Sequence, residues 1–321
     1  MKNSIMCNAM NFNARMLLNG VIILVLTTGR VVCQDEVPEA FFVKKSEISL
    51  SYTHAPGARE LSFYQWNGSP QKWRKEVKGK LTELIRLIPA GQPVVTEVRK
   101  MEHQGVTIHA LVMEIDNHLS IPAYLLVPPE DSEQQVPVMA IHGHGEVEQC
   151  IGLRDDYHHF FALELAKAGH LVLCPELRGF GTLEDLAFQR EIDRLDYWNW
   201  GGHMQYSLVS DNYLYGSTLV GQTVGDLLLW EEWLAVTHGV DQLHVAGISY
   251  GGDLACLYPI FSERVERIFA SGTLCSLSVI YRRCYNAPAH CIPGILQWMD
   301  RSDIAGINAP RPIVFHYGEL D

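Results

Sequence analysis

The sequence predicts an α/β fold in which helices flank a mostly parallel β-sheet. Short apolar segments alternate with longer segments of helical character, which is the pattern of parallel strands joined by right-handed crossovers. The apolar segments expected to be strands are residues 136–141, 171–174, 243–246, 265–270 and 312–317. In addition, a Gly-Ile-Ser-Tyr-Gly turn at 247–251 lies between one of these segments and a segment that begins like a helix.

The composition is that of a globular protein, with 47% hydrophobic and 19% charged residues, and 321 residues can bury a substantial core. The net charge is −12 and there is no long basic tract, so we expect neither nucleic acid nor a stable membrane partner. The eight cysteines form no Cys-x-x-Cys pair and no zinc-binding spacing, and the sequence predicts no metal and no cofactor. Cys174 and Cys256 lie in apolar segments and are expected to be buried thiols.

Residues 1–34 are expected to be a signal peptide. Lys2 and Arg15 precede an apolar run at 21–26 that is too short to span a membrane, and small and polar residues follow. The residues after Arg30 lack the small-x-small pattern of a cleavage site. The sequence therefore predicts a secreted or periplasmic protein, with an uncleaved N-terminal membrane anchor as the alternative.

Residues 35–95 are predicted to hold an irregular segment followed by a helical flap that packs on the core. Ser69 is a suitable N-cap and Pro70 a suitable first helical residue. Apolar residues then recur at steps of three and four, as on one face of an amphipathic helix. The residues of this stripe are Trp73, Val77, Leu81, Leu84 and Ile88.

The α/β core is expected to cover residues 96–321. Segments 106–115 and 121–127 flank a short turn and are predicted to form an antiparallel hairpin at the sheet edge. Two insertions, at 182–218 and 272–306, interrupt the alternation of strands and helices. The first is rich in Tyr and Trp, and its aromatic side chains are expected either to line the substrate pocket or to pack the loop onto the core.

Two helices are expected between the strands of this core. One covers 157–168, with Asp156 as its N-cap and Gly169 as the glycine that ends it. The other covers 220–237, carries apolar residues at helical spacing and leads into the strand before the Gly-x-Ser-x-Gly turn.

Ser249 is the candidate nucleophile. A strand, a sharp turn carrying Gly-x-Ser-x-Gly and a helix form a nucleophile elbow, in which the turn lifts the serine hydroxyl clear of the sheet. The flanking Gly247 and Gly251 permit a backbone conformation in which a Cβ would clash. The start of the next helix favours negative charge that develops nearby. We therefore expect acyl transfer in which Ser249 forms a covalent acyl-enzyme.

Acyl transfer also needs backbone donors for the oxyanion. The N–H of Tyr250, the residue after the nucleophile, is expected to be one of them. The second is expected in the loop after the strand at 136–141, where the sequence reads His142-Gly143-His144-Gly145. We assign it to the backbone N–H of His144, with that of Gly145 as the close alternative. These histidines are not expected to bind a metal, because no third ligand is near them in the sequence.

Four segments together resemble the α/β-hydrolase superfamily: residues 138–145, 178–181 (Arg-Gly-Phe-Gly), 247–252 and 309–321. The sequence is most similar to the acetyl xylan esterase and dienelactone hydrolase-like branch, over about residues 96–321. The resemblance implies the α/β-hydrolase fold and a carboxylic ester hydrolase with a serine nucleophile. Dienelactone hydrolases use a cysteine nucleophile, so the serine here favours the esterase side of the branch.

The resemblance also implies a catalytic acid in the loop after the seventh strand. Asp321 lies there, and Glu319 is the other candidate. The triad histidine normally follows the acid, whereas His290 and His316 precede Asp321. We therefore expect the triad histidine beyond Asp321, and we expect the chain to be a fragment, truncated after the strand that precedes the acid, nearly inactive and poorly soluble. The alternative is that His290, or another histidine already present, is the base.

The function predicted from the sequence is hydrolysis of a carboxylic ester, with small-molecule or carbohydrate esters as partners and an acetylated carbohydrate as one candidate substrate. Ser-Tyr-Gly-Gly at the turn also occurs in prolyl-peptidase-like hydrolases, which makes a serine peptidase the first alternative, although no propeller-sized region precedes the core. A catalytically inactive hydrolase-fold protein that binds a ligand or a partner is the second alternative.

Overall fold

We describe the protein from a computed structural model. The structure describes residues 59–87, 91–116, 119–183, 205–277 and 288–318. All of them belong to one compact unit, Lys44–Asp321, while a second unit, Met1–Val43, lies outside the described residues. The predicted signal peptide at 1–34 and the candidate acid Asp321 also lie outside them.

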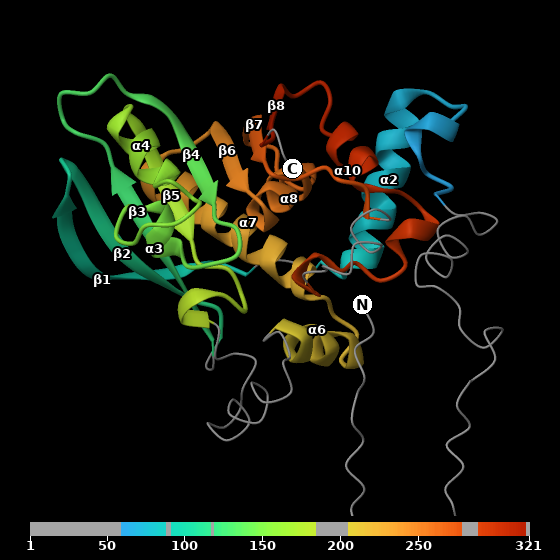
Figure 1. The fold of residues 1–321 in the computed structure, drawn as a ribbon, viewed down its shortest axis with the longest axis horizontal. Coiled ribbons are helices and arrows are strands. Elements are labelled where there is room, and N and C mark those ends of the chain that lie inside the picture. Colours follow the sequence, from blue (N-terminus) through green and yellow to red (C-terminus); the bar gives the residue numbers. More distant parts are fainter. Residues whose placement is uncertain (1–58, 88–90, 117–118, 184–204, 278–287, 319–321) are drawn as a thin grey trace, which may run out of the picture. The chain divides into compact units, whose positions relative to one another are not determined.

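The described part of the chain forms one eight-stranded sheet with the strand order β1-β2-β3-β5-β4-β6-β7-β8 (Figure 1). The strands are β1 Val94–His103, β2 Val106–Glu114, β3 Ser120–Val127, β4 Gln135–Ile141, β5 His170–Pro175, β6 Leu243–Ile248, β7 Val265–Ser271 and β8 Ile313–His316. The pairs β1–β2, β2–β3 and β3–β5 are antiparallel, and the pairs from β5 to β8 are parallel. The predicted class, a mostly parallel sheet with flanking helices, is confirmed.

The predicted hairpin of β2 and β3 is present, with Thr107 opposite Val127, but it does not form the sheet edge. β1 pairs with the outer side of β2 and takes the edge, so that part of the prediction is wrong. Most residues of β1 are exposed, and its sequence mixes charged with apolar side chains. Because of this mixed composition, β1 lacks the apolar pattern by which strands are predicted from sequence. Charged side chains on an edge strand also prevent it from pairing with another chain.

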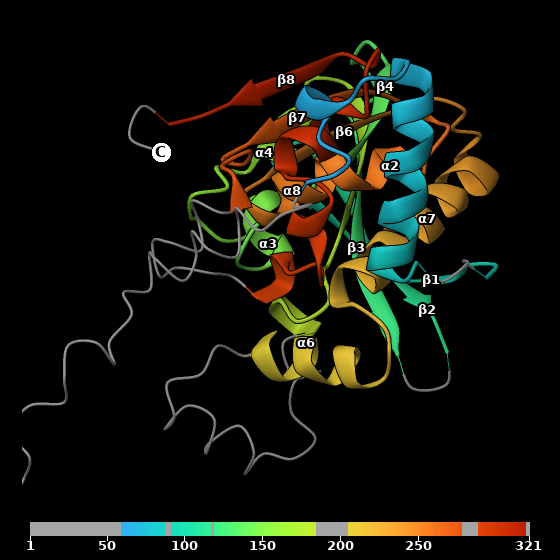
Figure 2. The same cartoon turned by 90° about the vertical axis from the view of Figure 1, so that its right-hand side faces the viewer.

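Helices cover both faces of the sheet (Figures 1 and 2). They are α2 Pro70–Ile85, α3 Val147–Cys150, α4 Phe161–Lys167, α6 Gln205–Leu214, α7 Leu219–His238, α8 Tyr250–Leu257 and α10 Arg301–Gly306, with short 3₁₀ turns at Phe63–Gln65, Tyr258–Ile260, Pro288–His290 and Ile295–Gln297. On β4, Met139 and Ile141 belong to the larger core cluster, which includes side chains of α2, α7 and α8. Val138 and Ala140 belong to a second cluster with side chains of α3 and α4. Because both faces are buried, the strand is a continuous apolar run.

The helix α2 begins as predicted and is part of the main core. The Ser69 hydroxyl accepts a hydrogen bond from the backbone N–H of Lys72 at 3.2 Å, and Pro70 is the first helical residue. Its fully or nearly buried residues recur at every fourth position and are Trp73, Val77, Leu81 and Ile85. The predicted stripe is therefore right for its first three members, whereas Leu84 is only half-buried and Ile88 lies outside the described residues. At its end, the hydroxyl of Thr218, the N-cap of α7, donates to the carbonyl of Ile85.

The helix predicted at 157–168 begins later than expected, since α4 starts at Phe161. The Asp156 carboxylate accepts from the backbone N–H of His158 at 2.8 Å and thereby caps a turn rather than the helix. His159 and Phe160 then have φ of 50° and 54°, a left-handed conformation that cannot be part of a right-handed α-helix, so the helix begins only at Phe161. The end of the helix at Gly169, with φ 99°, agrees with the prediction.

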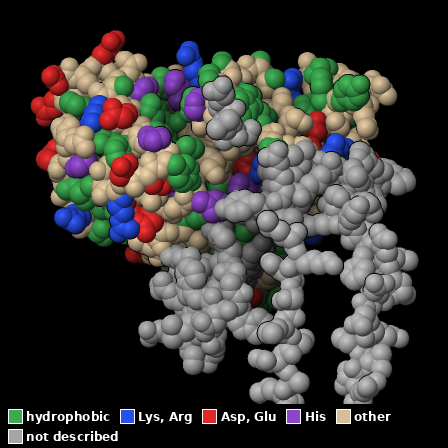
Figure 3. Space-filling view, in the orientation of Figure 1, with side chains coloured by type: hydrophobic (Ala, Val, Ile, Leu, Met, Phe, Trp, Pro, Cys, Tyr) green, Lys and Arg blue, Asp and Glu red, His purple; other side chains and the backbone are tan. Residues whose placement is uncertain are grey.

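The described surface is mixed in charge. On the face shown in Figure 3, acidic and basic side chains lie interspersed, and several histidines lie toward the middle of the view. Cys174 and Cys256 are buried, as predicted. Within the described ranges, we find no helix with the length and apolar character that a membrane span requires.

Candidate active site

Ser249 lies in the turn between β6 and α8, at the carboxyl end of β6. Its backbone has φ 57° and ψ −118°, a conformation that residues other than glycine rarely adopt and that costs about 1–3 kcal/mol. The Ser249 N–H donates to the carbonyl of Ser271, at the end of β7, at 2.8 Å. The strand, turn and helix predicted around Ser249 are present, and the turn has the strain expected of a nucleophile elbow.

The elbow packs so closely against the end of β4 that Gly251 admits no side chain. A Cβ on Gly251 would lie 2.1 Å from the carbonyl oxygen of Ile141 and 2.4 Å from that of His142. These distances are far below van der Waals contact. The close approach brings the start of α8 against the residue that opens the loop at 142–145.

This loop lies directly beside the Ser249 side chain. A Cβ on Gly143 would lie 2.9 Å from the Cβ of Ser249. Loop and elbow therefore meet at the carboxyl ends of β4 and β6, the edge at which open α/β sheets bind ligands. The backbone N–H groups of His144 and Tyr250 belong to these two segments, and their role as oxyanion donors stays a prediction.

Three neighbouring residues that were not predicted from the sequence hold the loop in place. The Gly143 N–H donates to Nε2 of His158 at 2.8 Å, and Nδ1 of His158 lies 2.8 Å from both carboxylate oxygens of Asp156. The Tyr157 hydroxyl donates to the carbonyl of His144 at 2.8 Å. The only sequence signal for these residues was that all five residues at 155–159 are titratable. The segment was instead assigned to a helix.

His158 is a buried histidine paired with a carboxylate, yet its contacts exclude it as the base for Ser249. Its Nδ1–H donates to Asp156, and its Nε2 accepts from Gly143, so both ring nitrogens of the neutral imidazole are in use. Burial lowers the pKa of His158 below its ordinary value, and Asp156 offsets only part of this effect. His158 is thus a fixed acceptor that positions the backbone of the loop.

The lowered pKa of His158 predicts a loss of stability in mild acid. The unfolded chain binds the proton first, so the contribution of neutral His158 is complete above the ordinary pKa of 6.5 and is lost as the pH falls through the lower, folded pKa. We expect the free energy of unfolding of the wild type to fall more steeply from roughly pH 6.5 to 5 than that of His158→Gln, measured by urea unfolding. His159→Gln, at the exposed neighbouring position, is the control and should keep nearly the wild-type slope, because the charge of His159 is the last-ranked influence on the pKa of His158. Equal slopes for wild type and His158→Gln would contradict the assignment.

His142 is buried and joins the loops after β4 and β5. Its Nδ1 lies 2.7 Å from the carbonyl oxygen of Gly143, and its Nε2 lies 2.7 Å from Oε1 of Glu176, which is also buried. The imidazole is therefore engaged in supporting the loop. Among the residues that the structure describes, no three His, Cys, Asp or Glu side chains are grouped so that they could hold a metal ion.

The Arg-Gly-Phe-Gly segment at 178–181 supports the site from the next loop. Arg178 binds Asp226 of α7 through two hydrogen bonds, from Nε at 2.6 Å and from Nη2 at 2.8 Å. Such bidentate pairs fix orientation as well as position. The Phe180 ring lies with its centroid 5.1 Å from that of His144 and 5.5 Å from that of Tyr250. The side chains of both predicted oxyanion residues thus pack on one ring.

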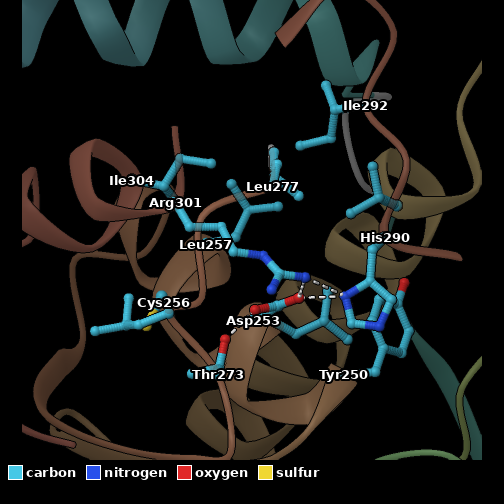
Figure 4. Close-up of a pocket in the computed structure, with 13 residues that line it drawn as sticks. Tyr250, Asp253, Cys256, Leu257, Thr273, Leu277, His290, Ile292, Arg301 and Ile304 are labelled. Carbon is cyan, nitrogen blue, oxygen red and sulfur yellow. Dashed lines mark hydrogen bonds and ion pairs between the residues drawn. The ribbon is translucent and has the colours of Figure 1, made fainter. Parts of the chain in front are cut away.

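A cavity of about 40 Å³ lies next to the elbow, bordered by apolar side chains of α8 and α10 and by a cluster of polar ones (Figure 4). At the centre of the cluster is Asp253, one helical turn after Ser249, which accepts hydrogen bonds from Arg301 Nη2 at 2.6 Å, from Thr273 and from His290. Burial alone would raise the pKa of Asp253, but His290 and Arg301 bring it below its ordinary value. The cavity has room for a few water molecules.

The structure leaves the rest of the predicted triad open. Asp321 and Glu319 lie outside the described residues, so the catalytic acid stays a prediction. Of the histidines that precede Asp321, His290 is paired with Asp253. His316 is exposed on β8, where its Nδ1 lies 2.9 Å from Oγ of Ser271.

The two predicted insertions contact each other near this cavity. Tyr213, on α6 in the first insertion, donates its hydroxyl hydrogen to the carbonyl of Cys291 in the second, at 3.0 Å. Tyr215 is 89% exposed. Tyr197, Trp198 and Trp200 of the first insertion lie outside the described residues, as does the side chain of Tyr206, and the predicted place of these aromatic residues in the substrate pocket stays a prediction.

Comparisons with known proteins place this geometry in a known fold. No protein-family model matches the sequence, and no curated protein matches it. A Bacteroides fragilis protein assigned as an acetyl xylan esterase matches the structure with a TM-score of 0.68 and 17% identity, over 85% of this chain and 75% of that one. A methylesterase matches with a TM-score of 0.52 and 15% identity, over 77% of this chain and 50% of the longer methylesterase chain. With its sheet order and its elbow after β6, the chain therefore has the α/β-hydrolase fold that its motifs indicate.

Proposed function

We propose that the protein is a serine hydrolase that cleaves a carboxylic ester through an acyl-enzyme on Ser249. The observation that carries the proposal is the strained Ser249 backbone, with φ 57°, directly beside the glycine loop at 142–145. Strain of this kind persists only where surrounding structure enforces it, and it clusters at active sites. The names of the two structural neighbours, an acetyl xylan esterase and a methylesterase, favour an ester over an amide.

In the proposed reaction, Ser249 Oγ attacks the carbonyl carbon of the ester while a base takes its proton. The carbonyl π pair moves to the oxygen, and the resulting oxyanion is held by the backbone N–H groups of Tyr250 and His144. Collapse of this intermediate expels the alcohol, which receives the proton from the base. Water then attacks the acyl-enzyme through the same two steps and releases the carboxylic acid product. Asp321 is the proposed triad carboxylate that orients the base.

Ester hydrolysis can be tested against peptide hydrolysis in parallel assays. In a form that includes the triad histidine, the protein is expected to release p-nitrophenol from p-nitrophenyl acetate and to leave the p-nitroanilide of a short proline-containing peptide intact. A higher kcat/KM on the anilide would favour the peptidase alternative. If neither compound is cleaved by protein that circular dichroism shows to be folded, the binding-protein alternative is favoured instead.

The two neighbour names suggest two ester substrates, which a second pair of assays can separate. One substrate is an acetylated xylan fragment, which releases acetate, and the other is a carboxylic acid methyl ester, which releases methanol. The resemblance at 96–321 to the acetyl xylan esterase branch favours acetate release. Methanol release at the higher kcat/KM would reverse this assignment and leave the acyl-enzyme mechanism intact.

A further inference from the structure

The Tyr157 hydroxyl lies where the glycine loop meets the elbow. It donates a hydrogen bond to the carbonyl of His144 at 2.8 Å, and the Ser249 side chain is near enough to lower the pKa of this hydroxyl. A Cβ on Gly143 would lie 2.3 Å from this hydroxyl and 2.9 Å from the Cβ of Ser249. The Tyr157 hydroxyl and the candidate nucleophile Ser249 therefore both lie beside the loop backbone at Gly143.

The position of Tyr157 is fixed by the same contacts that fix the loop. Its ring lies against the His158 ring, with a centroid distance of 4.1 Å and an interplanar angle of 35°. His158 in turn is held by Asp156 and accepts the Gly143 N–H. Tyr157 is 42% exposed, so a ligand can reach the side chain from solvent. Tyr157 is therefore held by protein contacts on one side and exposed to solvent on the other.

Given the proposed acyl transfer on Ser249, on which this inference rests, we propose that Tyr157 is a further catalytic residue whose hydroxyl donates a hydrogen bond to the oxyanion. As the bond between Ser249 Oγ and the carbonyl carbon forms, negative charge develops on the carbonyl oxygen, one bond away from that carbon and on the side where the Tyr157 hydroxyl and Ser249 both border Gly143. Tyr157 then turns its donated hydrogen from the His144 carbonyl to the oxyanion. It keeps its proton, and the serine proton goes to the base.

The chemistry of the hydroxyl fits a donor and not a base. Burial, and next the charge of Asp156, raise the pKa of Tyr157 above its ordinary value. The group therefore stays protonated at neutral pH and has a hydrogen to donate. A donor aimed at developing charge stabilises the transition state more than the bound substrate, so its loss lowers kcat with little change in KM.

Tyr157→Phe tests the proposal, because it keeps the ring on His158 and removes only the hydroxyl. We expect kcat for p-nitrophenyl acetate to fall by about 10²–10³-fold, the loss seen when one oxyanion donor is removed, with KM nearly unchanged. The matched control is Tyr124→Phe on β3, which removes a hydroxyl that donates to Glu148 at 2.9 Å. Its kcat should equal that of the wild type.

A second readout covers the case in which Tyr157→Phe lowers the thermal midpoint. Affinity for a boronic acid, which forms a tetrahedral oxyanion on the serine, should weaken by the same factor as kcat when measured well below that midpoint. A kcat within twofold of the wild type, or a loss confined to KM or stability, overturns the Tyr157 proposal. The proposed function fails separately, namely if Ser249→Ala retains turnover in the same assay.

Discussion

In a form of the protein that includes the triad histidine, Ser249→Ala is expected to abolish most ester turnover, leaving only about 10³–10⁴-fold catalysis over the reaction in water. The reason is that the other groups of the site can bind and polarise the ester, but only Oγ of Ser249 can form the acyl bond. The measurement is kcat/KM for p-nitrophenyl acetate on protein freed of contaminating esterases. Activity above a few per cent of the wild type would mean that Ser249 is not the nucleophile.

Ser249→Gly is the informative companion variant. It should be as inactive as Ser249→Ala, yet glycine relieves the strain at φ 57° and ψ −118°. We therefore expect the free energy of unfolding to rise by about 1–3 kcal/mol relative to wild type, measured by urea unfolding. Inactivity combined with higher stability would show that the strained serine is kept for chemistry and not for folding. A stability below that of Ser249→Ala would contradict the strain argument.

Gly251→Ala is expected to be strongly damaging, although it adds only one methyl group. The added Cβ would sit 2.1 Å from the Ile141 carbonyl oxygen, so α8 and the end of β4 must move apart. Overpacking of this kind typically costs about 1–3 kcal/mol and sometimes more. Because the Gly143 loop follows β4 directly, we also expect a loss of kcat larger than the loss of folded protein explains.

Gly79→Ala is the matched control for this prediction. Gly79 lies on the exposed side of α2, and a Cβ there would meet nothing within 4 Å. Alanine in a helix interior is favoured over glycine by about 1 kcal/mol, so this variant should be slightly more stable and equally active. Urea unfolding of both variants makes the comparison. Wild-type stability for Gly251→Ala would show that there is room for a methyl group between Gly251 and the Ile141 carbonyl, which contradicts the close packing of elbow and strand.

The elbow could be predicted because all of its information is local. A buried strand, two glycines and a helix start lie within a dozen residues around Ser249, and each has its own sequence signal. The start of α2 was predictable for the same reason, since the Ser69 cap is adjacent to Pro70. The apolar stripe of α2 was predicted to continue from Leu81 to Leu84, whereas the next buried residue is Ile85. A period of 3.6 residues allows a step of either three or four.

The supporting network could not be predicted, because its partners are distant in sequence or compete with a stronger pattern. Arg301 and Asp253 are 48 positions apart, and their pairing depends on how the second insertion returns to α8. The contacts between Asp156 and His158 are local, but the spacing of the surrounding apolar residues indicates a helix. In the structure, the hydrogen bonds of the Asp156 carboxylate to His158 form a turn in place of the first part of that helix. Tyr157 carries no sequence signal of its own.

The central claim is that Ser249 is the nucleophile, and covalent labelling with a fluorophosphonate tests it most directly. The serine oxygen attacks phosphorus and fluoride leaves, so an active nucleophile acquires one phosphonyl group. We predict a single adduct by intact mass, which peptide mapping assigns to Ser249, and a loss of ester turnover in proportion to labelling. An adduct on another residue, or a chain that hydrolyses the ester while Ser249 stays unlabelled, would contradict the account.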